Sequence, residues 1–188
     1  MMKKESNVVY ILRLALTLLV ITSLVAAALA GVNGITAPII ARQMAEKTRQ
    51  AVETVLPGGG EEIADRNAVG FEDANLISKV YRGENGYAVQ VTPAGFDNTI
   101  TMMVGIDNDG RVLGIDIISH TETAGLGAVA DAETPAGQNF RNQFVGISGN
   151  AAVTKDGGAV DAITGATITS RAICRGVNAA LACVAAMD

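Results

Sequence analysis

The residues best suited to do chemistry lie near the C-terminus, in a segment from Asp161 to Ser170 that reads DAITGATITS. Its core is a D-x-x-T-G-A-T string, which is followed by two more hydroxyl side chains and an alanine-rich run. A threonine hydroxyl becomes a nucleophile when a neighbouring base removes its proton, and no base or metal ligand stands beside this string in the sequence. We therefore expect an attachment point here and not the nucleophile of a hydrolase.

A second interpretation of the same segment is structural. Gly165 would supply a tight turn, and Thr164 or Thr169 would cap the N-terminus of the helix that follows. The attachment interpretation is favoured because the string resembles the motif at which FMN is joined through its phosphate to a threonine hydroxyl. In this chain that threonine is Thr167.

A second polar segment, residues 119–127, reads SHTETAGLG. Its two glycines permit backbone conformations and close approaches that a side chain would block. Glu122 and Thr123 add polar groups, and Leu126 adds an apolar side chain. A flavin needs this mixture, because its ring system requires an apolar wall and its edge requires a few polar atoms. The two segments together predict a flavin site.

The N-terminal part of the chain is apolar. Residues 14–41 contain no charged side chain, and a membrane span needs about 20 such residues. We predict a transmembrane helix over residues 10–34, preceded by a cytoplasmic N-terminus at residues 1–9. The flank up to Arg13 has three basic residues and one acidic residue, which favours the cytoplasmic side. The net charge of the whole chain is −5, so the remainder carries −7, which argues against nucleic-acid binding.

A cleaved signal peptide is the alternative to a membrane anchor. Ala28-Leu29-Ala30 matches the small-x-small cleavage pattern, and Lys3-Lys4 would form the charged region before it. We favour an uncleaved anchor, because the uncharged stretch continues past that site. Both alternatives place the main domain on the extracytoplasmic, periplasmic side of the cytoplasmic (inner) membrane.

Two further regions follow the span. Residues 35–60 predict a stalk helix and linker, with Pro38 in the first turn and a Pro-Gly-Gly-Gly stop at the end. Residues 61–188 predict an α+β domain, an antiparallel sheet with helices packed around it. Strands are expected at residues 76–81, 86–92, 99–106 and 112–119, with the hairpin turn Asp107-Asn108-Asp109-Gly110 between the last two, and a C-terminal helix at residues 169–187.

Other side chains of chemical interest are assigned to structural roles. Phe140 and Phe144 are four residues apart, share one helix face and are expected to pack in the core. Cys174 and Cys183 would lie about 13 Å apart on one helix, too far for a disulfide, and are expected to be buried as small apolar residues. The single His120 cannot form a metal site unaided, and no metal is expected.

Nearly the whole chain resembles the G subunit of the Rnf electron-transport complex, an ion-pumping ferredoxin:NAD⁺ oxidoreductase of bacterial membranes, and is similar to the C subunit of the sodium-pumping NADH:quinone reductase. The resemblance rests on the basic N-terminus, the single span, the Val-Leu-Pro helix end, the E-T-x-G-L-G loop and the T-G-A-T motif. It implies an FMN held by a phosphoester bond to Thr167. It also implies that a flavin transferase using FAD recognises Asp161, Thr164, Gly165 and Ala166, and that Glu122, Thr123, Leu126 and Gly127 line the flavin.

The chain departs from the family pattern at two places. Ala124 stands where the family usually has proline, which loosens the backbone restriction of that loop. Residues 95–98 are less rich in glycine than in the family, so flavin contacts are not expected there.

The implied function is that of a membrane-anchored electron carrier, the electron-transfer subunit of an ion-translocating oxidoreductase, with no catalytic residues or substrate turnover of its own. Its partners would be other membrane and redox subunits and, during maturation, the flavin transferase. Two alternatives come from other classes. One is a stand-alone secreted FMN-binding flavoenzyme with its own proton donor, and the other is a cofactor-free, membrane-anchored binding module.

Overall fold

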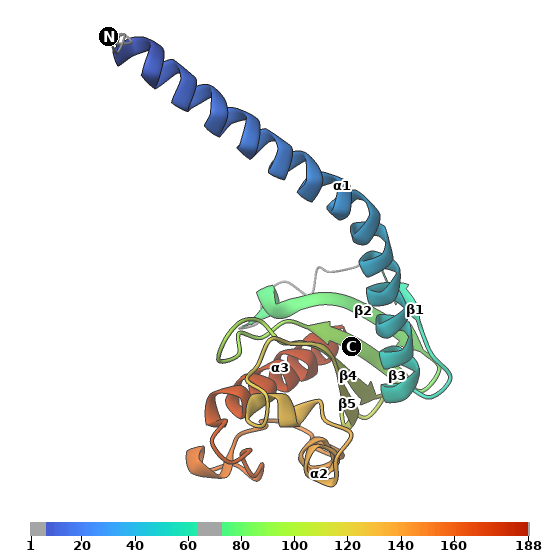
Figure 1. Ribbon diagram of the computed structural model, residues 1–188. Coiled ribbons are helices and arrows are strands. Elements are labelled where there is room, and N and C mark those ends of the chain that lie inside the picture. The colour runs from blue at the N-terminus through green and yellow to red at the C-terminus, as the bar shows by residue number, and fades with distance from the viewer. Residues whose placement is uncertain (1–6, 64–72, 188) are drawn as a thin grey trace, which may run out of the picture. The chain divides into compact units, whose positions relative to one another are not determined.

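The computed structural model describes residues 7–63 and 73–187. Most of the predicted cytoplasmic N-terminus, including Lys3 and Lys4, lies outside the described residues. The chain divides into two compact units, Met1–Ala45 and Glu46–Asp188. The long helix α1 (Asn7–Val55) contributes to both units (Figure 1).

In the first unit, α1 exposes its apolar side chains. Its large hydrophobic residues from Val9 to Ile40 are all at least 50% exposed. The helix is long and apolar enough to cross a membrane, and none of its most apolar window is buried. Water disfavours an apolar surface of this extent, so the helix indicates a membrane-associated protein.

Pro38 lies inside α1, so the expectation that it stands in the first turn of the stalk helix is wrong. A proline within a helix lacks the N–H that would bond to the carbonyl four residues earlier, here that of Gly34. The helix nevertheless continues to Val55, so the loss of this one bond does not end it.

The second unit is built on a five-stranded antiparallel sheet in which strands adjacent in sequence pair throughout (Figure 1). The four predicted strands are confirmed, each within two residues at either end. The sequence pattern does not reveal β1, because three residues are too few to show alternation. The strands are β1 (Glu61–Ile63), β2 (Ile77–Gly83), β3 (Gly86–Val91), β4 (Thr101–Asp107) and β5 (Val112–Ser119).

The predicted hairpin turn joins β4 to β5. Asp107 Oδ1 accepts hydrogen bonds from the backbone N–H groups of Asp109 at 3.0 Å and Arg111 at 2.7 Å. Gly110 has φ +74°, a left-handed conformation that favours glycine. The carboxylate of Asp107 therefore stabilises the turn itself.

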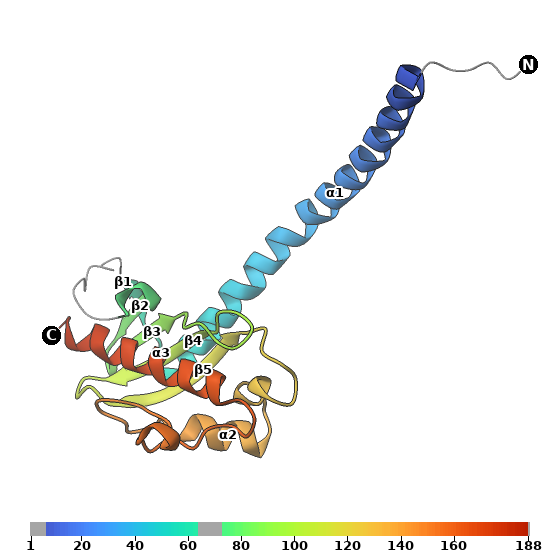
Figure 2. The ribbon, with the colours of Figure 1, turned by 90° about the vertical axis from the view of Figure 1, so that its left-hand side faces the viewer.

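Different helices cover the two faces of the sheet (Figures 1 and 2). The helix α3 (Thr167–Ala185) packs in the larger core with α2 (Pro135–Asn142), and the last turns of α1 pack against the other face. Successive strand residues point to opposite faces, so Met102 lies on the α3 side and Met103 on the α1 side. The segment predicted as a stalk therefore ends inside the folded unit.

The predicted core residues near the C-terminus are buried as expected. Phe140 and Phe144 meet edge to face, with ring centroids 5.5 Å apart. Cys174 and Cys183 are buried free thiols. The core thus holds α2 and α3 in place around the segment that carries Thr167.

Candidate cofactor site

Residues 161–166 form the turn that leads into α3, and Thr167 is the first residue of that helix. Gly165 adopts φ +77°, which favours glycine. Ser170 closes the turn, because its hydroxyl accepts from the Ile163 N–H at 3.0 Å and donates to the Ala166 carbonyl at 3.0 Å. These contacts hold the Thr167 hydroxyl at the start of the helix.

The expectation that Thr164 or Thr169 caps α3 is wrong. Ala166 occupies the capping position, and within the described residues no side chain caps the helix there. Thr164 is exposed, and the Thr169 hydroxyl donates to the Glu122 carboxylate. Ser170 stabilises the turn from within the helix instead, by the two bonds described above.

Glu122 is a buried carboxylate, 7% exposed, that joins three segments of the chain. Its Oε1 accepts from the backbone N–H groups of Phe96 at 2.8 Å and Asp97 at 3.3 Å. Its Oε2 accepts from the Thr169 hydroxyl in a short contact. A buried carboxylate is destabilising unless donors satisfy it, and here both oxygens have donors. Glu122 therefore ties the loop before β4 to the start of α3.

Two glycines make room for this carboxylate. A Cβ at Gly127 would lie 2.5 Å from Glu122 Oε2 and 2.6 Å from Thr169 Oγ1. A Cβ at Gly95 would lie 2.3 Å from Glu122 Oε1. These separations are too short for non-bonded atoms, so both positions require glycine while Glu122 stays in place.

A pocket of about 280 Å³ opens beside Thr167. Both predicted segments contribute to its wall. Asp161 and Thr164 are exposed and are not among the residues that line it; the Asp161 N–H donates to Gln143 Oε1 at 2.7 Å. The predicted residues that do line the pocket are Glu122, Thr123, Leu126, Gly127, Gly165, Ala166 and Thr167.

Four other residues line the pocket, namely Phe96, Lys155, Ile168 and Thr169. Ile168 and Thr169 follow Thr167 directly, so adjacency could have identified them. Phe96 belongs to the segment from which no contact was expected, and Glu122 holds its backbone at the pocket. No motif in the sequence identifies Lys155 as a pocket residue, because its position depends on how the turn that contains it packs against α3. Its Nζ donates to Thr167 Oγ1 in a long contact of 3.5 Å.

The walls of this pocket are suited to a flavin. Phe96, Ile168 and Leu126 are 65%, 50% and 43% exposed, so the pocket offers apolar surface that a planar ring system could cover. Among the described residues that line it, Lys155 is the only cation, and it lies beside the Thr167 hydroxyl. A ring system that ends in a phosphate matches an apolar wall that ends in a cation and a hydroxyl.

His120 supports the loop that carries Glu122. Its Nδ1 accepts from the Glu122 N–H at 3.1 Å, and its Nε2 lies 3.6 Å from Asp131 Oδ2. Burial raises the pKa of Asp131 above its ordinary value, and the charges of His120 and Arg141 oppose that rise. His120 does not line the pocket. In the part of the chain that the structure describes, no three His, Cys, Asp or Glu residues are grouped as metal ligands.

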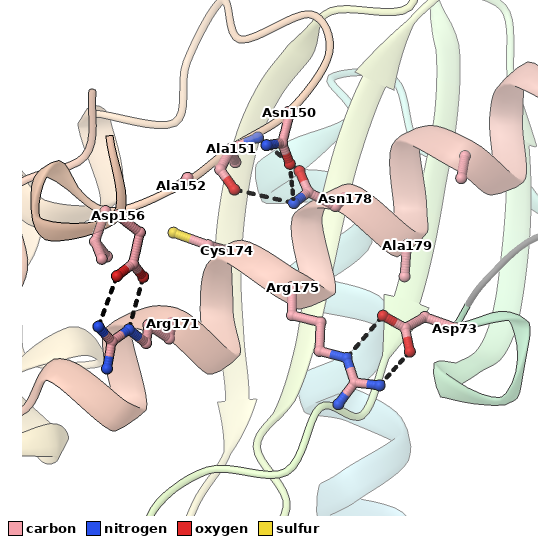
Figure 3. Close-up of a pocket in the computed structure, with 12 residues that line it drawn as sticks. Asp73, Asn150, Ala151, Ala152, Asp156, Arg171, Cys174, Arg175, Asn178 and Ala179 are labelled. Atoms are coloured by element: carbon pink, nitrogen blue, oxygen red, sulfur yellow. Dashed lines mark hydrogen bonds and ion pairs between the residues drawn. The ribbon is translucent and has the colours of Figure 1, made fainter. Parts of the chain in front are cut away.

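A larger groove of about 510 Å³ runs along another side of α3 (Figure 3). Arg171 donates to Asp156 through two contacts of 2.7 and 2.6 Å, and Arg175 pairs with Asp73. These guanidinium groups lower the pKa of the Asp156 and Asp73 carboxyls. Each of these charges already has a partner of opposite sign in the protein.

Comparison with known proteins agrees with the geometry of the smaller pocket. Residues 95–182 match the family model of the FMN-binding domain. The matched range contains every residue that lines the pocket beside Thr167. It does not include the apolar helix or the first three strands.

Similarity to individual proteins extends over most of the chain. The G subunit of the Na(+)-translocating ferredoxin:NAD(+) oxidoreductase complex of Acetobacterium woodii is 34% identical, with 89% of this chain and 88% of that protein covered. The G subunit of the ion-translocating oxidoreductase complex of Methanosarcina acetivorans is 31% identical, with 95% and 96% covered. The protein of the same name from Photorhabdus laumondii is 33% identical, with 88% and 86% covered. The chain belongs to the family of G subunits of the ion-translocating oxidoreductase complexes, the Rnf complexes.

Proposed function

We propose that this chain holds one FMN, attached through its phosphate to Thr167, and relays electrons within an Rnf-type ion-translocating ferredoxin:NAD⁺ oxidoreductase. The observation that carries the proposal is the position of Thr167, whose hydroxyl begins α3 at the wall of a pocket built from the two predicted segments. The FMN-binding domain match supports the cofactor, and the names of the relatives support the complex.

Attachment would exchange one phosphate bond for another. The Thr167 oxygen bonds to the phosphorus on the FMN side of FAD, the pyrophosphate bond breaks, and AMP leaves with the bridging oxygen. The hydroxyl proton passes to the transferase or to water, and no electrons are exchanged. Thr167 is partly exposed, so a separate enzyme can reach it, and the exposed Asp161 and Thr164 are accessible for recognition.

Bound FMN would supply the redox chemistry, because a flavin accepts and releases one or two electrons. Phe96, Leu126 and Ile168 would cover the apolar ring, while Gly127 and Gly165 keep the pocket wall free of side chains. The volume of about 280 Å³ lies just below the range of about 300–1,000 Å³ for small-molecule sites. Part of the ring would therefore stay exposed for electron exchange with a neighbouring carrier.

The apolar helix α1 would anchor this domain, with the N-terminus in the cytoplasm and the FMN on the extracytoplasmic side. Anchoring raises the effective concentration of the flavin near other membrane and redox subunits, which would be its partners. A covalent tether also prevents loss of the cofactor outside the cell. The carrier needs no proton donor of its own, so His120 can serve the loop alone.

The decisive experiment is Thr167→Ala, with Thr121→Ala as a matched control because Thr121 is an exposed threonine outside the pocket. Each full-length chain is co-expressed with a flavin transferase, denatured, and examined by intact mass and in-gel fluorescence. We expect wild type and Thr121→Ala to gain the mass of FMN less water, and Thr167→Ala to gain none. In membranes, Thr167→Ala should insert normally and lose electron transfer through this subunit.

Two outcomes would contradict the proposal. A wild-type chain that gains no mass with an active transferase would favour the cofactor-free binding module. Wild-type electron-transfer rates in the Thr167→Ala variant would exclude the relay.

A further inference from the structure

Lys155 and Asp156 are adjacent in the sequence, but they line different cavities. Lys155 lines the pocket beside Thr167, whereas Asp156 lines the groove along α3. Both belong to the short 3₁₀ turn η3 (Thr154–Asp156), which ends at Gly157 with φ +85°. One turn therefore places a cation in the pocket and a carboxylate outside it.

Asp156 anchors this turn to α3. Its carboxylate accepts from Arg171 Nε at 2.7 Å and Nη2 at 2.6 Å (Figure 3). Arg171 follows Thr167 by four residues, which is about one helical turn. The pair holds η3 against the start of α3, and the Arg171 charge balances a carboxylate that would otherwise repel a phosphate on Thr167.

Backbone contacts close the same turn. The Thr154 N–H donates to the Val160 carbonyl at 2.8 Å, and the Val160 N–H donates to the Ala152 carbonyl at 3.1 Å. A Cβ at Gly158 would lie 2.0 Å from the Ala152 oxygen, so the chain packs closely here. Val160 leads directly into Asp161, so these bonds connect the turn that carries Lys155 to the segment before Thr167. The Asp156–Arg171 pair connects the same turn to α3, after Thr167.

We propose that Lys155 is the positioning residue for the phosphate that links the flavin to Thr167; this inference rests on the proposed covalent attachment. Its Nζ lies 3.5 Å from Thr167 Oγ1, and a phosphorus bonded to that oxygen would bring its free oxygens within reach of the ammonium group. The phosphoester keeps one negative charge, and charge-assisted contacts are stronger than neutral ones. During attachment, the ammonium group also offsets the charge of the FAD phosphates while the new bond forms and AMP leaves.

The test compares Lys155→Met, which removes the charge but keeps an unbranched side chain, with Lys155→Arg, which keeps the charge. Lys79→Met is the matched control, because Lys79 pairs with Glu62 at 2.8 Å and does not line the pocket. Each full-length chain receives FAD and a limiting amount of flavin transferase, and intact mass gives the initial rate of FMN incorporation. The melting temperature of each unlabelled chain is measured in parallel.

We expect Lys155→Met to incorporate FMN about three- to tenfold more slowly than wild type, as for loss of one exposed charge-assisted contact. Lys155→Arg and Lys79→Met should stay within about twofold of wild type, and the melting temperatures should not change. Added salt should slow the wild type more than Lys155→Met, because screening acts on the charge that this variant lacks.

Three results would overturn the inference. Incorporation into Lys155→Met at the wild-type rate would do so and would leave attachment at Thr167 intact. An equally slow Lys155→Arg would show that the positive charge is not what matters. A wild-type chain that gains no FMN mass with an active transferase would remove the proposed function and this inference with it.

Discussion

The pocket beside Thr167 and the groove along α3 share one helix but differ in what their walls contain. The groove is the larger, at about 510 Å³ against about 280 Å³. Its charged side chains are paired, Arg171 with Asp156 and Arg175 with Asp73 (Figure 3). The pocket instead presents exposed apolar side chains, one cation and a hydroxyl at the start of a helix.

This difference shows that volume alone does not identify a binding site. A ligand in the groove would have to compete with ion pairs that the protein has already formed, and so would gain little. In the pocket, the buried Glu122 carboxylate is satisfied by protein donors, while Phe96 and Thr167 line the open volume. A ligand there would cover apolar surface without breaking an ion pair.

The largest change in stability and FMN incorporation is expected from Glu122→Ala, in the wall of the pocket. It removes the acceptor of the Thr169 hydroxyl and of the Phe96 and Asp97 N–H groups. The Thr169 hydroxyl is buried, and an unsatisfied buried donor costs about 1–3 kcal/mol, so the free energy of unfolding should fall by at least that amount. FMN incorporation should fall as well, because the pocket wall loses its support. Chemical denaturation and intact mass measure the two effects.

Glu122→Gln is the matched variant for that prediction. Its amide oxygen can still accept from the Phe96 N–H, and its amide nitrogen can donate to the Thr169 hydroxyl. It should therefore lose much less stability than Glu122→Ala. Equal losses in the two variants would contradict the role of Glu122 as an acceptor shared by three segments.

A second prediction concerns the thiol in the wall of the groove. Burial raises the pKa of Cys174 to about 11 and raises that of Cys183 as well. Because the thiolate is the reactive form, alkylation of Cys174 at pH 8 should be at least about 100-fold slower in the native chain than in the unfolded one. Rapid native labelling of Cys174, located by peptide mass spectrometry, would show that the groove holds a reactive nucleophile.

The smallest effect is expected from Asp73→Asn, which breaks one ion pair of the groove. The Arg175 guanidinium lowers the pKa of Asp73, so the pair contributes stability above the ordinary aspartate pKa of about 3.9. That contribution is lost as the pH falls through the lower, folded-state pKa. At pH 7 the variant should lose at most about 1 kcal/mol of unfolding free energy, and the difference from wild type should vanish in acid.

FMN incorporation provides the control for that variant. It should be unchanged in Asp73→Asn, because Asp73 lies outside the pocket. If the Asp73→Asn variant folds but no longer incorporates FMN, the groove takes part in flavin binding. That result would contradict the assignment of the flavin to the pocket alone.

Much of the fold could be predicted from the sequence because its signals are local. Apolar and β-branched runs bounded by turn residues mark β2 to β5, and the Asp107–Gly110 turn follows from the preference of each residue for its own backbone conformation. The expectation for Pro38 was wrong because one missing hydrogen bond does not by itself end a long helix. The three-residue strand β1 was hidden because it depends on pairing with β2.

The sequence by itself singled out the T-G-A-T segment with Thr167, the glycine-rich loop and the apolar helix, because each is a run of adjacent residues with a recognisable pattern. Only the tertiary structure decided which side chains share the pocket. Phe96 lies at the pocket because the buried carboxylate of Glu122 accepts a hydrogen bond from its backbone N–H. Lys155 lies there because the neighbouring Asp156 forms an ion pair with Arg171 of α3. Contacts between residues far apart in the chain have no local pattern, so folding alone brings these groups together.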